Sequence, residues 1–211
     1  MKKRKPGIFI TLEGPDGAGK STQLALLGRA LTRLGHKVLL TREPGGSPRA
    51  AAIRRLVLDN KGELSTASEL LLFLADRAQH VHDTLLPALE AGKVVLCDRY
   101  SDSTFAYQGG GRGYRAPLLR SLDRFASGGL KPQLTLLFDL DAPRGLGRAA
   151  KGGRSKPDRM EALGLAFHSR VRGEFLKLAA KEPRRIKVIR VAGKSPAEVL
   201  DEGMSHLRKL L

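Results

Sequence analysis

Short runs of apolar residues alternate with longer segments of helical periodicity along this chain. The apolar runs occupy residues 7–13, 36–43, 93–99, 133–141 and 185–193. Their apolar positions are nearly continuous instead of alternating with polar ones, which is typical of strands covered on both faces. Strands that alternate with helices in this way predict an α/β fold with a mainly parallel sheet flanked by helices.

The longest helical pattern covers residues 65–91. Thr66 and Glu69 have the spacing of a capping box at its start, and Gly92 marks its end. The periodicity predicts further helices at residues 21–34, 116–127 and 196–211.

Residues 144–159 differ in composition from the rest of the chain, because they are rich in glycine and basic residues and poor in large apolar ones. This composition predicts a mobile, solvent-facing basic lid between the fourth strand and the next helix. Residues 1–6 are predicted to form a basic tail, since the apolar run that follows them is too short for a signal peptide.

Composition bounds the class of protein. A length of 211 residues and an apolar content of 41% fit one domain over residues 1–211. No apolar run is long enough to cross a bilayer. The single cysteine, Cys97, rules out an internal disulfide and fits a cytoplasmic location. The formal charge of +17 suggests a polyanionic partner, and composition alone leaves nucleic acid, nucleotides and simple solubility open.

Residues 14–21, GPDGAGKS, match the phosphate-loop pattern G-x-x-x-x-G-K-[ST] between a predicted strand and a predicted helix. In that context backbone N–H groups and a helix N-terminus surround phosphate. Lys20 would place its ammonium on the β- and γ-phosphates, and the Ser21 hydroxyl would bind Mg²⁺. The predicted ATP-binding residues are Gly14, Pro15, Asp16, Gly17, Ala18, Gly19, Lys20, Ser21 and Thr22.

Two other classes of phosphate-loop protein fit the sequence poorly. GTP-hydrolysing switches need Asn-Lys-x-Asp late in the chain, and the nearest string here is NKGE at residues 60–63. Motor and helicase ATPases usually carry more domains than 211 residues can hold. The chain length and the predicted lid therefore favour a small phosphate-loop kinase.

A second motif, residues 94–113, starts as a strand and is predicted to end in a glycine-rich loop. Asp98 falls at the carboxyl end of that strand, where open α/β sheets bind ligands, and would hold Mg²⁺. Arg99 would grip a phosphate, unless the two side chains simply form a local ion pair.

Phe73 and Arg77 share one face of the longest predicted helix. The pattern alone favours core packing for Phe73 and a solvated edge for Arg77. The alternative is a ring on which a nucleobase stacks, beside a donor that reads a base carbonyl.

With these residues the chain resembles the thymidylate kinase family over nearly its whole length. The resemblance rests on LEGPDGAGKST, TREPGG, LLLFLADRAQHV, CDRYSDSTFAYQGGGRG, and DLD followed by a basic lid and DRME, all in the family's order and spacing. It implies a five-stranded parallel sheet of the nucleoside monophosphate kinase type within the P-loop NTPases. It also implies transfer of the γ-phosphoryl group of ATP to dTMP with Mg²⁺, and a homodimer.

The resemblance assigns roles residue by residue. Phe73 would stack on thymine, Arg77 would bind its O4, and Thr104 would lie at its N3 edge. Asp16 would accept a hydrogen bond from the sugar 3′-hydroxyl, and Tyr107 would exclude a 2′-hydroxyl. The implied dTMP-binding residues are Asp16, Pro44, Arg54, Leu58, Phe73, Arg77, Arg99, Thr104, Tyr107 and Gln108, with the Glu43–Pro44 bond expected to be cis.

Some family members carry an arginine directly after the loop aspartate, where this chain has Gly17. The resemblance then implies that the lid supplies the missing charge, from Arg148 or Arg154. A phosphate monoester is already mostly a dianion at neutral pH, so the reaction needs no general base. The implied catalytic residues are Lys20, Arg99, Arg148 and Arg154, and the implied metal ligands are Ser21 and Asp98.

Two alternatives stay open. One is a kinase for another nucleotide or a deoxynucleoside. The other is a basic nucleic-acid-binding P-loop ATPase, which the charge of +17 suggests. An aromatic content of 5% and the lack of a concentrated basic motif outside the lid and tail argue against nucleic acid as a partner.

Overall fold

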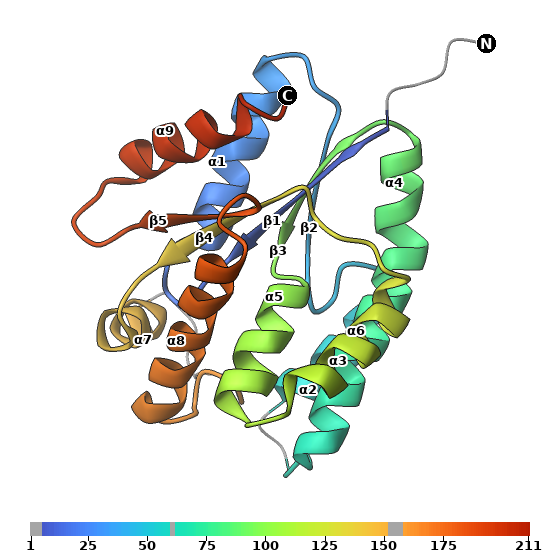
Figure 1. Ribbon diagram of the computed structural model, residues 1–211, viewed down its shortest axis with the longest axis vertical. Helices are drawn as coiled ribbons and strands as arrows, with labels where there is room; N and C mark the ends of the chain where they lie inside the picture. Colours follow the sequence, from blue (N-terminus) through green and yellow to red (C-terminus); the bar gives the residue numbers. More distant parts are fainter. Residues whose placement is uncertain (1–5, 60–61, 152–157) are drawn as a thin grey trace.

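The computed structural model describes residues 6–59, 62–151 and 158–211. Its centre is a five-stranded sheet in the order β2-β3-β1-β4-β5, in which every neighbouring pair is parallel. The strands are β1 (Ile8–Glu13), β2 (Val38–Arg42), β3 (Val94–Asp98), β4 (Leu134–Asp139) and β5 (Ile186–Arg190). Figure 1 shows helices on both sides of this sheet, so the predicted fold class is confirmed.

The two faces of the sheet pack against different helices because successive side chains of a strand point in opposite directions. On β4, Leu136 joins the core beneath α1 (Lys20–Arg33) and α9 (Pro196–Leu207), whereas Leu137 joins the core beneath α8 (Leu165–Lys181). Both leucines are almost fully buried. The continuous apolar strand pattern therefore reflects a layer of helices on each face.

The predicted long helix is present, with a wider turn inside it. α3 (Thr66–His80) continues through the π-helical turn η1 (Val81–Leu85) into α4 (Leu86–Glu90). The π turn ends two residues before Pro87, whose ring would clash with the carbonyl of the residue four positions earlier in a regular helix.

The predicted cap of this helix was wrong. Ser65 is the N-cap and accepts a hydrogen bond from the Ser68 backbone N–H at 3.0 Å. Glu69 is fully buried and binds side chains from other segments.

Two further helical segments were not predicted. α2 (Pro48–Leu58) begins at Ser47, whose side chain accepts from the Ala50 N–H, with proline in the first turn. The expected glycine-rich loop is instead α5 (Ser101–Thr104) followed by the π-helical segment η2 (Phe105–Gly111). A Cβ at Gly111 would approach the Phe167 ring of α8 to 2.5 Å, so this glycine permits close helix packing.

Part of the predicted lid is also helical, since α7 spans Ala142–Lys151. The predicted helix at residues 116–127 is confirmed as α6 (Ala116–Ser127), and α9 ends before the predicted boundary at residue 211. Residues 152–157 with Arg154, and residues 1–5 of the predicted tail, lie outside the described residues. Within the described part of the chain, no helix has both the length and the apolar character needed to cross a membrane.

Candidate active site

A cavity of about 450 Å³ opens where the phosphate loop meets the carboxyl ends of the strands. Open α/β sheets bind ligands at this edge. The cavity brings together most of the side chains singled out by the sequence, from six separate stretches of the chain. Those that line it are Asp16, Gly17, Gly19, Lys20, Ser21, Thr22, Pro44, Arg54, Leu58, Phe73, Arg77, Asp98, Arg99, Thr104, Tyr107, Gln108 and Arg148.

The remaining predicted ATP-binding residues, Gly14, Pro15 and Ala18, belong to the loop but are not part of the cavity lining. Gly14 has φ +136°, and a Cβ there would collide with the Phe138 carbonyl oxygen of β4. Glycine at this position therefore lets the loop lie against the sheet.

The ammonium of Lys20 lies over the loop backbone. It donates to the carbonyl oxygens of Gly14 at 3.1 Å and Pro15 at 2.8 Å. Burial, and after it the charge of Arg99, lower the pKa of Lys20 to about 8. The ammonium is thus a desolvated charge held by neutral acceptors, and an arriving phosphate group would stabilise it.

Asp16 is paired with Arg99. The Arg99 Nη2 donates to Asp16 Oδ1 at 2.6 Å and to the Tyr107 hydroxyl at 3.0 Å, and that hydroxyl donates to Asp16 Oδ2 at 2.8 Å. Burial alone would raise the pKa of Asp16, but the charges of Arg99 and Lys20 lower it to about 2. The loop carboxylate is therefore ionised, and its charge is balanced by that of Arg99.

The backbone at Arg99 has φ +71°, which is unusual for a residue other than glycine. Glu13 supports this turn and was not identified from the sequence. Its buried carboxyl group accepts from the Tyr100 N–H at 2.7 Å and from the Ser103 hydroxyl at 2.6 Å. Burial, and then the nearby Asp102, raise the pKa of Glu13 to about 8.

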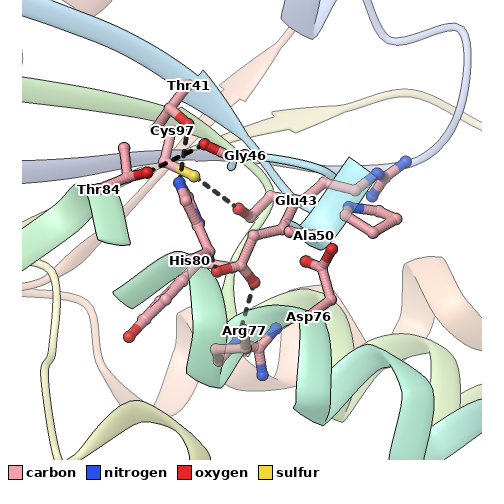
Figure 2. A network of polar contacts seen from close by, with 12 residues as sticks. Thr41, Glu43, Gly46, Ala50, Asp76, Arg77, His80, Thr84 and Cys97 are labelled. Carbon is pink, nitrogen blue, oxygen red and sulfur yellow. Dashed lines mark hydrogen bonds and ion pairs between the residues drawn. The ribbon is translucent and has the colours of Figure 1, made fainter. Parts of the chain in front are cut away.

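Arg77 is buried, so its predicted place on a solvated edge was wrong. Its Nε donates to Glu43 at 2.9 Å, and its Nη1 donates to Thr104 at 2.8 Å and to Asp123 at 2.7 Å. Figure 2 shows the Arg77 side chain beside Glu43. Phe73 is half buried: it packs against the hydrophobic core and also lines the cavity, and its stacking on a nucleobase stays a prediction.

A buried polar network extends behind Arg77. Glu43 also contacts His80 Nδ1 at 3.0 Å, and His80 Nε2 contacts the Thr41 hydroxyl at 2.7 Å (Figure 2). Asp76 lies on the other side of Glu43 and accepts from the Gly45 N–H at 2.7 Å. The Glu43–Pro44 bond is cis, as expected.

The second oxygen of Asp76 is buried and has no hydrogen-bond partner among the described residues. Burial, and then the charge of Glu43, raise the pKa of Asp76 to about 7. The carboxyl thus lies in the wall of the cavity and titrates near neutral pH.

Ser21 and Asp98 fit a magnesium ion. The Ser21 hydroxyl donates to Asp98 Oδ2 at 2.9 Å, and Asp98 Oδ1 is buried without a partner among the described residues. Within the described ranges, no group of three or more His, Cys, Asp or Glu side chains could hold a metal by itself. Two oxygen groups beside a phosphate loop suit Mg²⁺, which commonly takes few protein ligands together with substrate phosphates.

α7 packs directly on the phosphate loop. A Cβ at Gly17, which has φ +72°, would collide with the Gly145 carbonyl oxygen, and a Cβ at Gly145 would lie 2.5 Å from the Asp16 carbonyl oxygen. The position of Gly17 therefore has no room for an arginine. Arg148, one turn further along α7, is exposed and lines the cavity.

Other residues of the cavity wall were not identified from the sequence. They are Arg42, Glu43, Asp76, Tyr100, Ser103, Ala149, Asp158, Met160 and Glu161. Several of them lie in segments that the sequence predicts to be a glycine-rich loop and a flexible lid. A loop has no regular spacing from which the direction of a side chain could be inferred, whereas a helix does. Asp158, Met160 and Glu161 belong to the DRME string, which carried a signal only through the family resemblance.

The strand order and the phosphate loop between β1 and α1 define a P-loop nucleotide-binding protein of the nucleoside monophosphate kinase type. A family model described as thymidylate kinase matches residues 12–202. The chain belongs to the thymidylate kinase family.

Individual relatives agree with this assignment. The chain is 55% identical to a thymidylate kinase of Deinococcus radiodurans over 87% of this chain and 88% of that protein. It is 50% identical to one of Syntrophotalea carbinolica over 88% of each. The crystal structure of thymidylate kinase from Ehrlichia chaffeensis superimposes with a TM-score of 0.79 at 34% identity, covering 97% of this chain and all of that one.

The contact between α7 and the phosphate loop predicts opposite effects for two substitutions on the same helix. Gly145→Ala should lower the free energy of unfolding by about 1–3 kcal/mol, because the added methyl group meets loop backbone. Gly147→Ala should instead raise it by up to about 1 kcal/mol, because a Cβ there meets nothing within 4 Å and alanine favours a helix. Urea unfolding of both variants measures this, and equal stabilities would contradict the contact.

The buried Asp76 predicts a pH-dependent stability difference. Its pKa rises from an ordinary 3.8 to about 7 on folding, so the folded state binds the proton more tightly, and stability falls as pH rises through this range. Asp76→Asn keeps an oxygen for the Gly45 N–H and removes the ionisation. The variant should therefore gain stability relative to the parent as the pH rises from about 4 to about 7, measured by thermal unfolding. Parallel pH profiles for the two proteins would show that Asp76 does not titrate there.

Proposed function

We propose that the chain transfers the γ-phosphoryl group of ATP to dTMP, giving ADP and dTDP, as a single kinase domain over residues 1–211. Its family membership supports this reaction. The observation that carries the proposal is one continuous cavity lined both by residues of the phosphate loop and by Phe73 and Arg77. Such a cavity would hold two nucleotides with their phosphates facing each other.

At the ATP end, residues 14–22 would bind the triphosphate. The charge on the transferring phosphoryl group would be neutralised by Lys20, Arg99 and Arg148. Arg154 is the second lid arginine that the sequence predicts for this role. Mg²⁺ held by Ser21 and Asp98 would supply Lewis-acid stabilisation of the phosphate oxygens. Phosphoryl transfer depends mainly on such positioning and charge stabilisation.

At the acceptor end, the hydrogen bonds of Arg77 favour thymine over cytosine. Its Nε and Nη1 are engaged, which leaves Nη2 without a hydrogen bond among the described residues and able to donate to the base O4. The Thr104 hydroxyl accepts from Arg77, and its remaining lone pair would accept the N3–H of the base. Cytosine would present an amino group to the guanidinium, so two donors would face each other.

The sugar and phosphate of dTMP would be held mainly by side chains that already contact one another, namely Asp16, Arg99 and Tyr107. Asp16 would accept from the sugar 3′-hydroxyl, and Tyr107 would occupy the space of a 2′-hydroxyl. Arg54 and Arg99 would bind the acceptor phosphate. Gln108, Pro44 and Leu58 would complete the wall. The phosphate is a dianion, so no residue is needed to remove a proton.

A homodimer and a cytoplasmic location complete the proposal. Leu71 of α3 and Leu118 and Phe125 of α6 are exposed large apolar side chains, and Phe125 is 89% exposed. α3 and α6 pack against each other through a shared core that includes Leu70 and Leu119. An apolar face on two adjoining helices is suited to a two-fold interface.

A coupled assay with a panel of nucleosides and monophosphates tests the reaction. dTMP should be the best acceptor, and Lys20→Ala should lower turnover by about 10²–10³-fold, because it removes one key charge from the transferring group. A clear preference for another acceptor would replace dTMP in the proposal. Hydrolysis of ATP stimulated by DNA instead of dTMP would favour the nucleic-acid-binding ATPase.

Light scattering tests the dimer. The parent should have twice the mass of one chain, and Phe125→Glu should convert it to a monomer, because a charge would be buried in an apolar interface. Leu165→Glu is the matched control, since Leu165 is also exposed but lies at the start of α8. A monomeric parent, or equal effects of the two substitutions, would contradict an interface on α3 and α6.

A further inference from the structure

Glu69 is a fully buried carboxylate that has no role in the reaction proposed above. It lies on α3 one turn before Phe73. One of its oxygens accepts from Gln108 Nε2 at 3.2 Å and Arg112 Nε at 3.1 Å. The other accepts from Arg112 Nη2 at 2.6 Å and Arg159 Nη1 at 2.7 Å. Such a saturated buried carboxylate is expected to fix the segments that it joins.

Its partners belong to two other segments of the chain. Gln108 lies in η2, and Arg112 is the C-cap of η2, with its guanidinium 5.2 Å from the centre of the Phe167 ring. Arg159 continues the connection to α2, because its Nε donates to the Val57 carbonyl oxygen at 3.0 Å. Glu69 therefore links α3, η2, the end of α2 and the turn that contains Arg159.

The segments joined in this way form one wall of the cavity. The Asp158 carboxylate accepts from the N–H groups of Met160 and Glu161 at 3.0 and 2.9 Å, so residues 158–161 form a compact turn around Arg159. Asp158, Met160 and Glu161 all line the cavity, as does Leu58 from the end of α2. If Arg159 were displaced, the side chains of Asp158, Met160, Glu161 and Leu58 would all shift with it.

The charges explain why the arrangement holds at neutral pH. Burial raises the pKa of Glu69, but the hydrogen bonds from Arg112 and Arg159 outweigh it and leave the pKa below its ordinary value. The carboxylate is ionised and faces two guanidinium groups. Removal of Arg159 leaves it paired with Arg112, whereas removal of Glu69 leaves two cations together without their counterion.

We infer that Glu69 is a positioning residue for the acceptor nucleotide: through Arg159 it fixes the turn 158–161, and through Gln108 and Arg112 it fixes η2. The inference rests on the proposed function in taking dTMP as the acceptor. Glu69 does not line the cavity, so its effect would pass through the wall that it holds in place.

Arg159→Ala is the principal test. The KM for dTMP should rise about tenfold or more, because small displacements of a binding wall have large effects, while kcat and the KM for ATP should stay close to the parent values. Arg172→Ala is the matched control. Arg172 makes a bidentate pair with Asp139 at 2.7 and 2.9 Å, and neither residue lines the cavity. This control should lower thermal stability without raising the KM for dTMP.

A double-mutant cycle with Glu69→Gln tests whether the two residues act together. Glu69→Gln combined with Arg159→Ala should raise the KM for dTMP by less than the product of the two single effects. An unchanged KM in Arg159→Ala, an equal rise in Arg172→Ala, or independent effects in the cycle would overturn the inference. If the parent prefers another acceptor, the proposed function fails, and the same variants are then judged by the KM for that acceptor.

Discussion

The ion pair between Asp16 and Arg99 joins the two halves of the site. Asp16 belongs to the phosphate loop after β1, and Arg99 follows β3, the strand beside it in the sheet. A carboxylate in a phosphate loop would repel ATP if it faced the phosphates. Here it faces Arg99 and Tyr107, so its negative charge is neutralised by the guanidinium of Arg99.

This pair depends in turn on an unusual backbone. Arg99, which reaches the loop, has its backbone in the left-handed region that usually favours glycine. Glu13 stabilises that turn through the Tyr100 N–H and the Ser103 hydroxyl. A buried acid behind the loop, with a pKa near 8, thus supports the residue that would hold a phosphate in front of it.

The sequence predicts the sheet well and the walls of the site poorly, and the reason lies in burial. Apolar strands and a phosphate loop are local patterns. α3, by contrast, buries polar side chains as well as apolar ones: Glu69, Asp76 and His80 share one buried face, and Arg77 lies on the same face as Leu70 and Leu74. Because a polar stripe looks the same whether it meets solvent or other side chains, Arg77 was misplaced on a solvated edge.

The glycine-rich segments were predicted to be flexible for a related reason, although they are largely helical. At Gly111 and Gly145 the glycine permits close packing, against Phe167 and the phosphate loop respectively, instead of flexibility. Both contacts lie between segments far apart in the chain, so no local pattern reveals them. Gly110 and Gly111 likewise let the π-helical segment η2 pack closely against α8.

The arrangement of charge also suggests how the cavity orients its ligands. Where a base would lie, the cations are matched by carboxylates: Arg77 by the buried Glu43 and the half-buried Asp123, and Arg159 by the buried Glu69. An uncharged base would therefore meet directed donors without a strong net field. On the loop side, Lys20 hydrogen-bonds only backbone carbonyls among the described residues, so its charge is available to an anion. Positive charge is thus balanced by carboxylates where a base would lie, and it remains available where phosphates would meet. This difference would favour the orientation in which a bound nucleotide places its phosphate towards Lys20.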